Sequence, residues 1–300
     1  MLNMELTIFL IIVVGYIVSK AGFFSQKTRS DMTNIVIYVI LPCNIFASFH
    51  KGLTPDTIRQ CIVVLIASFG LQFFYIILNK FLYIKFTPER RIVLQYGTMV
   101  NNASFIGLPV ISSVFGPTGV LYGSIILIPI RIFMWTIGLS LYSKSDNRQM
   151  VKQIATHPCI WAVILGFIYA FTPIELPVFL SGTITTVGNC ITTLTMLIVG
   201  SILSDVNPRN LLDKGCFYYS FFRLIAIPAV VFCVMTLLKA DTLTTGVVVL
   251  SSAMPAATTT AILAEKYGKD SEFASKTVFT STILSMVTLP LIAEILTRLL

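Results

Sequence analysis

Few of the 300 residues carry charge, because the chain has only 21 Lys and Arg and 13 Asp and Glu. About a quarter of the residues in a soluble domain are charged, so this chain cannot cover a water-exposed surface of its size. It also has no hydrophilic stretch long enough for a soluble domain, since the longest runs only from 143 to 157. Hydrophobic residues instead make up 56% of the chain, and we expect an integral membrane protein.

The sequence also lacks the patterns of an intramembrane enzyme. HExxH and GxSxG are absent, and no pair of acidic residues lies within an apolar run, so neither a metal site nor a nucleophile–base pair is predicted. No CxxC motif or Cys/His cluster occurs, which removes the signature of a zinc site or a disulfide framework. The six cysteines are scattered and are expected to be small apolar residues: Cys43, Cys61, Cys159, Cys190, Cys216 and Cys233. We expect a protein that is not an enzyme and needs no metal or cofactor.

Long apolar runs, by contrast, fill the chain. A membrane-spanning helix needs about 17–25 mostly apolar residues. Ten such runs are separated by charged residues or by Pro and Gly: 3–19, 32–49, 57–79, 92–114, 118–142, 158–172, 178–203, 215–238, 243–264 and 274–297. The sequence therefore predicts an all-α polytopic membrane protein with ten transmembrane helices, located in the cell (inner or plasma) membrane and surrounded by lipid.

The basic residues predict which loops face the cytoplasm. Fifteen of the 21 Lys and Arg fall in odd-numbered loops, four fall in even-numbered loops and termini, and Arg131 and Arg223 lie inside spans. Cytoplasmic loops carry an excess of Lys and Arg, so the odd-numbered loops are predicted to be cytoplasmic and both termini to be outside. The net charge of +8 therefore reflects topology, and no nucleic-acid partner is expected.

The ten predicted spans fall into two sets of five. The hydrophilic stretch in the middle of the chain separates them, giving a first repeat at 1–143, a cytoplasmic linker at 144–157 and a second repeat at 158–300. An odd number of spans in each half gives the halves opposite orientations, which is the inverted repeat of many secondary transporters.

The fourth span contains residues that a lipid-buried helix does not favour. In VNNASFIGLPVI, residues 100–111, adjacent Asn101 and Asn102 are followed by Gly107 and Pro109. Proline lacks an N–H and clashes with the preceding turn, while glycine leaves helical geometry at little cost. We expect Gly107 and Pro109 to interrupt the helix in the membrane. Asn101 and Asn102 would then bind substrate at that depth.

The ninth span carries a similar segment, LSSAMPAATTTA, with Pro255 followed by Thr258 and Thr259. Broken helices in matching spans of two inverted halves are expected to cross near the middle of the bilayer, with Thr258 and Thr259 contributing to the substrate site. A simple proline kink, with the hydroxyls bonded to their own helix, remains the alternative for this segment.

Two arginines are predicted inside spans. Arg131 lies roughly 18 Å from either end of the fifth span at the helical rise per residue, so it needs a cavity or a partner. Both a substrate anion and helix-end carbonyls remain as candidate partners for Arg131. Arg223 lies nearer the inner end of its span and is expected to extend its side chain to the interface. The coupling ion, H⁺ or Na⁺, is left open.

Four segments together resemble the auxin efflux carrier family: IVIYVILPCNIFASF (35–49), NNASFIGLPVISSVFG (101–116), TMLIVGSIL (195–203) and the run SSAMPAATTTAILAEKYG (251–268) with its continuation to 292. The family includes plant PIN auxin exporters and bacterial permeases for malonate, malate and similar anions, and the resemblance covers nearly the whole chain. The long central hydrophilic loop of the plant exporters is missing here, which places this chain with the bacterial type.

The resemblance implies crossing broken helices in the fourth and ninth spans, with Asn102, Pro109 and Pro255 at the positions of the family's crossover residues. It also implies a scaffold domain from spans 1, 2, 6 and 7 and a transport domain from spans 3–5 and 8–10. We therefore expect a secondary transporter that moves small organic anions by alternating access, with a homodimer as a possible assembly. A sodium-coupled organic-anion symporter of a related fold and a ligand sensor without transport are the alternatives.

Overall fold

The computed structural model describes residues 2–49, 54–142, 155–156, 158–172, 175–204 and 213–299. Nearly all of these residues are helical, and within them the only β-type pairing is a single bridge between Asn101 and Ala256. The expected all-helical fold is therefore confirmed for the described part of the chain. The predicted linker at 144–157 lies outside it, apart from Ala155 and Thr156.

Among the described residues, six helical runs are long and apolar enough to cross a membrane. They are Lys27–Ala47, Pro55–Leu82, Ala103–Gly138, Val178–Ser201, Lys214–Leu237 and Ser271–Leu299. Shorter apolar helices occur at Leu10–Lys20, Pro158–Phe171 and Thr242–Ser252, within three of the other expected spans. Length and composition thus support a polytopic membrane protein with at least six spanning helices.

The chain divides into two compact units, each assembled from three separate stretches. The first unit contains Met1–Arg59, Ser104–Ser124 and Thr156–Val206, and the second contains Gln60–Ala103, Ile125–Ala155 and Asn207–Leu300. Helix α6 (Leu108–Phe133) begins in the first unit and ends in the second. It bends at Gly116, whose φ of 63° and ψ of −157° are readily adopted only by glycine, at the boundary expected between the fourth and fifth spans.

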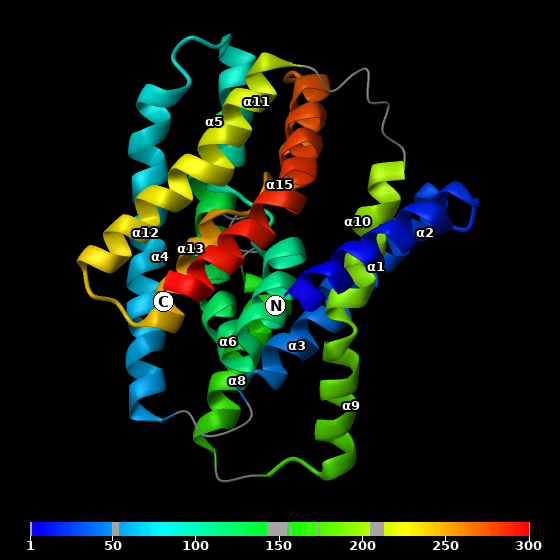
Figure 1. Cartoon of the computed structure of the whole chain (residues 1–300), viewed down its shortest axis with the longest axis vertical. Coiled ribbons are helices and arrows are strands. Elements are labelled where there is room, and N and C mark those ends of the chain that lie inside the picture. The colour runs from blue at the N-terminus through cyan, green and yellow to red at the C-terminus, as the bar shows by residue number, and fades with distance from the viewer. Residues whose placement is uncertain are drawn as a thin grey trace. The chain divides into compact units, whose positions relative to one another are not determined.

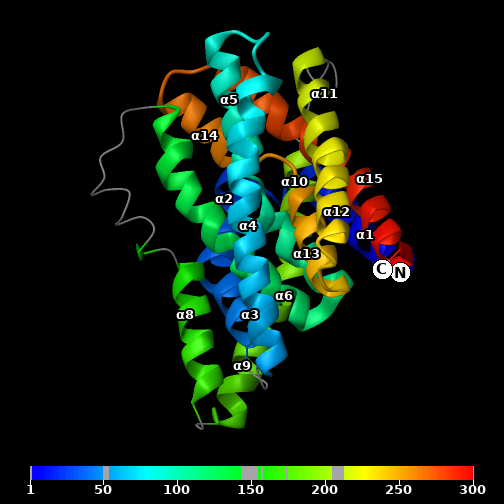
Figure 2. The same ribbon diagram turned by 90° about the vertical axis from the view of Figure 1, so that its left-hand side faces the viewer.

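The first unit is built around a close helix pair. Besides the first part of α6, this unit contains α1 (Leu2–Lys20), α2 (Gln26–Ile35), η1 (Val36–Ile40), α3 (Leu41–Ala47), α8 (Pro158–Phe171), α9 (Val178–Asn189) and α10 (Ile191–Ser204). Helix α1 packs along α10 (Figure 1), and α3 packs against α8 and α9 (Figure 2). A Cβ atom on Gly200 would lie 2.0 Å from the carbonyl oxygen of Ile12, so the α1–α10 contact requires glycine there.

The second unit contains the remaining helices: α4 (Pro55–Leu82, from Gln60), α5 (Pro88–Met99), η3 (Met134–Gly138), α11 (Lys214–Phe221), η5 (Phe222–Ala226), α12 (Ile227–Leu237), α13 (Thr242–Ser252), α14 (Thr259–Lys266) and α15 (Ser271–Leu299). Helix α15 packs against α5, α11, α13 and α14, and α12 packs against α13 (Figure 2). Helices η1, η3 and η5 are single wide turns of the π type inside longer helical runs.

Helix α4 shows how the second unit is adapted to lipid. Its polar residues Ser68, Gln72 and Asn79 repeat at helical spacing and are buried, whereas apolar residues on other faces, such as Ile66 and Ile77, are more than half exposed. A soluble helix has the opposite arrangement. The side-chain amide of Asn79 donates to the backbone carbonyl oxygen of Gln95 at 2.9 Å, and that of Gln95 donates to the backbone carbonyl oxygen of Asn79 at 3.1 Å. Polar contacts therefore join α4 to α5 inside the unit.

Candidate functional site

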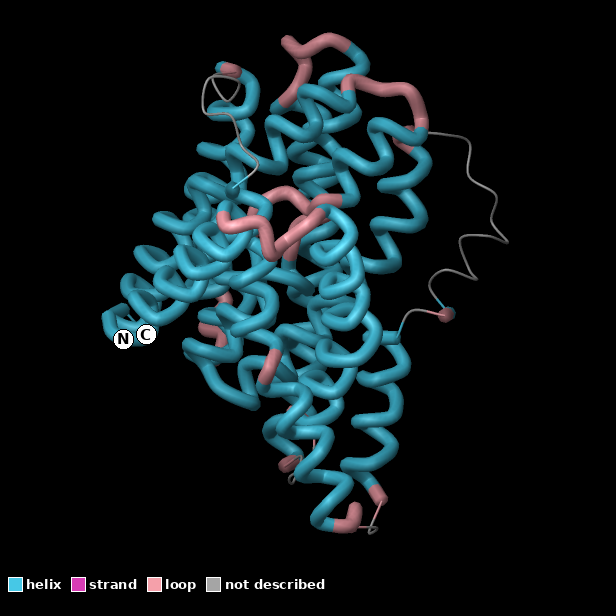
Figure 3. Tube along the Cα trace, turned by 90° about the vertical axis from the view of Figure 1, so that its right-hand side faces the viewer, coloured by secondary structure: helices cyan, strands magenta, loops and turns pink. Residues whose placement is uncertain are grey.

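Two helices of the second unit are interrupted at the same place. Helix α5 ends at Met99 and α13 ends at Ser252. The few residues that follow each helix are not helical, and loop segments (pink in Figure 3) break the helical trace. The backbone N–H of Asn102 donates to the carbonyl oxygen of Pro255 at 2.9 Å, and that of Ala257 donates to Val100 at 3.3 Å. The two interruptions therefore satisfy each other as a short antiparallel pair.

The interruption lies earlier than the sequence led us to expect. Residues 100–102 are non-helical, but the chain re-enters a wide turn, η2 (Ala103–Gly107), and then α6, so Gly107 and Pro109 are both helical. A proline early in a helix loses little, because its missing N–H falls where the turns are already irregular. Gly107 and Pro109 also belong to the first unit, whereas Asn101 and Asn102 belong to the second.

The two adjacent asparagines have different surroundings. The side-chain Nδ2 of Asn101 donates to the carbonyl oxygen of Ser251 at 2.6 Å, so Asn101 caps the last turn of α13. The side chain of Asn102 makes no hydrogen bond within the described part of the chain, although the residue is only 9% exposed. Asn101 therefore holds the crossing together, and Asn102 has hydrogen-bonding groups to offer a ligand.

The non-helical segment after α13 leads to the two threonines predicted to bind substrate. Thr258 is exposed, and Thr259 begins helix α14. The hydroxyl of Tyr96, a buried residue of α5, donates to Thr259 Oγ1 at 3.2 Å. Tyr96 and Thr259 thus join α5 to the start of α14, the helix that follows the interruption after α13. Sequence reasoning missed Tyr96, because a tyrosine in an apolar span gives no local sign of a partner 163 residues away.

Arg131 lies in the same unit and close to this contact. Its Nη1 donates to Met134 Sδ at 3.4 Å, and its guanidinium interacts electrostatically with the Tyr96 hydroxyl. Arg131 as a whole is partly exposed, although its Nε is buried. The structure therefore brings together Arg131, Tyr96 and Thr259. It pairs Asn101 and Asn102 with the chain around Pro255.

The prediction that Arg223 extends its side chain to the interface was wrong. Arg223 lies on η5 and is completely buried, with Nε donating to the carbonyl oxygen of Met254 at 2.9 Å and Nη1 donating to that of Thr98 at 3.0 Å. One turn earlier, the hydroxyl of Tyr219 donates to the carbonyl oxygen of Gly97 at 2.7 Å. The interruptions free carbonyl groups inside the unit, and these groups offer Arg223 partners that an unbroken helix does not have.

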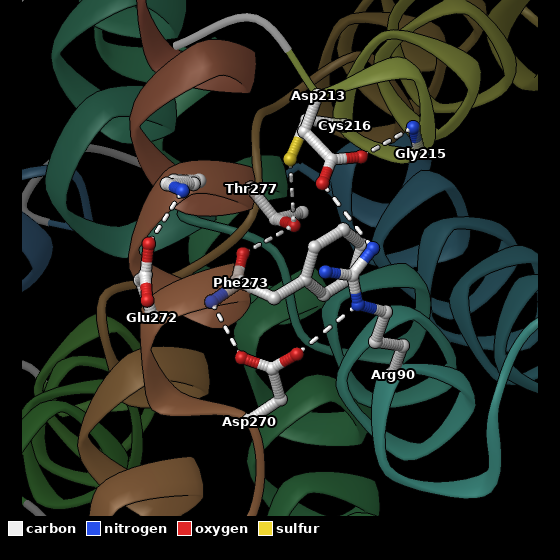
Figure 4. A network of polar contacts seen from close by, with 9 residues as sticks. Arg90, Asp213, Gly215, Cys216, Asp270, Glu272, Phe273 and Thr277 are labelled. Carbon is white, nitrogen blue, oxygen red and sulfur yellow. Dashed lines mark hydrogen bonds and ion pairs between the residues drawn. The ribbon is translucent and has the colours of Figure 1, made fainter. Parts of the chain in front are cut away.

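Arg90 joins the starts of three helices at one end of the second unit (Figure 4). It lies in the first turn of α5, and its guanidinium bonds Asp213 at 3.2 Å and Asp270 at 3.1 Å while lying 4.4 Å from the centre of the Phe273 ring. Asp213 also accepts from the backbone N–H of Gly215 at the start of α11, and Asp270 accepts from that of Phe273 near the start of α15. Each aspartate therefore both caps a helix and binds Arg90.

Asp213→Ala is expected to lower the free energy of unfolding by about 1–3 kcal/mol, since a helix cap and one part of an ion-pair network are lost together. Asp213→Asn, which keeps the cap acceptor, should lose less. Thermal unfolding of the purified protein in detergent measures the effect. Glu272→Ala is the matched control, because Glu272 is exposed and, among the described residues, pairs only with Lys276 on its own helix, so its loss should change little. Equal melting temperatures for Asp213→Ala and Glu272→Ala would show that the network does not hold the unit together.

Among the described residues, no three His, Cys, Asp or Glu side chains form a group able to hold a metal ion. The groups gathered at the crossing are instead carboxamides, hydroxyls, helix-end carbonyls and guanidinium ions. Such groups are typical of sites that hold small polar or anionic molecules in membrane carriers.

Helices that face lipid with their apolar side, and that break and pair inside a compact unit, are typical of membrane transport proteins. The chain belongs to the family described as Membrane transport protein, whose model matches residues 3–153 and 147–293. This is the auxin efflux carrier family that the sequence resembles, so that assignment is confirmed.

Known relatives match the chain over nearly its whole length. It is 25% identical over 305 residues to an uncharacterized transporter of Methanocaldococcus jannaschii, with 97% of both chains covered. It is also 25% identical over 299 residues to an uncharacterized transporter of Methanothermobacter thermautotrophicus, again with 97% of both covered. The uncharacterized transporter YfdV of Escherichia coli K12 is 21% identical over 300 residues, which cover 95% of this chain and 94% of YfdV.

Proposed function

We propose that the protein is a secondary carrier for small organic anions bearing carboxylate groups, and that it binds them where α5 and α13 are interrupted. One observation above all supports this proposal: the crossing holds a nearly buried carboxamide, that of Asn102, which no described residue engages. A carboxamide at this place offers a ligand both hydrogen-bond donors and an acceptor.

The neighbouring groups fit the charge of a carboxylate. Arg131 supplies a positive charge, and the exposed Thr258 offers a hydroxyl at the turn that leads into α14. The N-terminus of α14 adds a partial positive charge near Thr259. We assign hydrogen bonding of the anion to Asn102 and Thr258, and neutralisation of its charge to Arg131.

The division of the chain into two compact units supports alternating access as the mechanism. The first unit gathers the expected spans 1, 2, 6 and 7 together with residues 104–124 of spans 4 and 5. The second gathers spans 3, 8, 9 and 10 with the remaining parts of spans 4 and 5. We propose that the first unit is the scaffold and that the second is the transport domain carrying the crossing. We also propose that the ten spans form two inverted repeats, as the five-and-five pattern of the sequence suggests.

We further propose that both termini face the outside of the cell membrane, as the distribution of basic residues indicates. In a variant without native cysteines, Thr54→Cys should react with a membrane-impermeant thiol reagent added to intact cells. Ser271→Cys should react only after the cells are opened. Thr54 and Ser271 both lie in the described part of the chain, at helix starts on opposite sides of the predicted membrane. Labelling of Ser271→Cys in intact cells would show that residue 271 faces the outside and would contradict the proposed orientation.

Uptake into liposomes tests the function directly. Purified protein should carry labelled mono- and dicarboxylates into proteoliposomes and should also be stabilised by them, because a ligand raises the melting temperature of the state that it binds. Asn102→Ala should weaken both effects while remaining folded. Stabilisation without uptake would instead identify a ligand sensor, and the absence of both effects for every carboxylate tested would rule out the proposed substrate class.

A further inference from the structure

Arg223 carries a positive charge in the interior of the second unit. It is completely buried, and among the described residues no carboxylate forms an ion pair with it. Its guanidinium lies 4.9 Å from the centre of the Tyr75 ring, which offers a cation–π contact but no negative charge. An arginine stays protonated in proteins, so this charge is permanent and needs a physical explanation.

The partners of Arg223 provide that explanation. Thr98 lies in the last turn of α5, and Met254 lies two residues after the end of α13, so the guanidinium bonds the carbonyl end of α5 and the unwound backbone just beyond that of α13. Aligned peptide dipoles make the carbonyl end of a helix partly negative. Two such ends directed at one buried place create a site for a cation, and Arg223 fills it.

Broken helices in other inverted-repeat carriers use the same kind of place differently. There, unwound carbonyls and half-helix carbonyl ends coordinate the mobile coupling cation. Here the carbonyl oxygens of Thr98 and Met254 are bonded to Arg223, that of Gly97 to Tyr219, and that of Ser251 to Asn101. A sodium ion entering this place would have to displace the guanidinium from both helix ends.

We propose that Arg223 is a tethered cation that takes the place of a mobile coupling cation between α5 and α13, so that the carrier works without sodium. This inference rests on the proposed transport function and adds to it the absence of sodium coupling. It assigns Arg223 as a positioning residue, which fixes the two interrupted helices so that Asn101 and Asn102 are presented correctly.

The first test uses the wild-type protein. Its melting temperature, and its carboxylate uptake in proteoliposomes, should be the same in sodium chloride and in choline chloride at equal ionic strength. A higher melting temperature or faster uptake in sodium would overturn the inference. The melting measurement needs no substrate, so it separates failure of this inference from failure of the proposed function, in which no carboxylate is carried in either salt.

The second test asks whether a free cation can replace the side chain. Arg223→Ala should lower uptake at least about tenfold, because two charge-assisted hydrogen bonds are lost, and low-millimolar guanidinium should restore much of both uptake and melting temperature. Tyr219→Phe is the matched control: it removes a neutral bond to the same end of α5 and leaves no cation site, so guanidinium should not rescue it.

An equal response of Arg223→Ala and Tyr219→Phe to guanidinium would reduce Arg223 to an ordinary cap and overturn the proposal. If Arg223→Ala does not fold, Arg223→Lys takes its place. Lysine keeps the charge but not the fork of donors, so it should retain partial uptake that is still insensitive to sodium. A sodium-dependent Arg223→Lys would count against the proposal, because the tethered charge would then not be sufficient.

Discussion

Asn102→Ala is expected to weaken carboxylate binding by about five- to 150-fold while leaving the melting temperature of the ligand-free protein nearly unchanged. The carboxamide of Asn102 forms no hydrogen bond within the described part of the chain, so its removal costs the folded protein little. A bound anion, however, would lose a contact and leave a buried oxygen unsatisfied, at about 1–3 kcal/mol. Isothermal titration of purified wild type and variant measures the ratio of the dissociation constants.

Asn101→Ala provides the contrast one residue away. The amide of Asn101 caps Ser251 at the end of α13, and its loss leaves the buried Ser251 carbonyl with only long backbone contacts, such as that from the Met254 N–H at 3.5 Å. The free energy of unfolding should fall by about 1–3 kcal/mol, with a smaller effect on affinity than that of Asn102→Ala. If the two variants exchange these effects, so that Asn102 supports stability and Asn101 supports binding, the assignment of roles at the crossing is wrong.

The sequence predicted the membrane class and the family from features that are local or spread over the whole chain. Low charge and long apolar runs do not depend on which helix packs against which, and they correctly indicated a helical membrane protein. The quoted family segments, such as 101–116, likewise indicate the family without any knowledge of how the helices pack. Pattern reasoning is reliable for this class of statement, because lipid imposes the same requirement on every span.

The position of the helix interruption was harder to predict. Proline and glycine usually interrupt helices, so the interruption was predicted at Gly107 and Pro109. The helix instead ends at Met99. The helix ends there because it meets a distant segment of the same chain. The backbone of 100–102 forms hydrogen bonds with the backbone around Pro255, about 150 residues later. A tertiary partner outweighed the local preference of individual residues, and no single-sequence rule identifies such a partner.

The same limit explains Arg223 and Tyr219. A sequence shows an arginine near the end of a span, where extension to the interface is the ordinary outcome. It does not show that two helices break within reach of that side chain and leave their carbonyl groups to be satisfied. Buried cations of this kind can be predicted only once the positions of the interruptions are known, because the interruptions create the acceptors.

Arg131→Gln is expected to weaken carboxylate binding by at least about tenfold, because a charge-assisted contact contributes about 1.5–3 kcal/mol. Arg131 is partly exposed and lies near the Tyr96 hydroxyl, which is why we propose that its charge acts on a ligand at the crossing. Arg131→Lys should recover only part of the affinity, since a point charge does not reproduce the planar fork of a guanidinium. Competition between a carboxylate and its neutral amide analogue measures the effect on charge selectivity, which Arg131→Gln should abolish.

Tyr96→Phe separates this role from a structural one. It removes the bond between α5 and Thr259 but leaves the charge of Arg131 in place. It should therefore lower the melting temperature while keeping the preference for the carboxylate over the amide. If Arg131→Gln behaves in the same way, with a lower melting temperature and unchanged selectivity, then Arg131 supports the helix around Met134 and the positive charge that attracts the anion lies elsewhere in the chain.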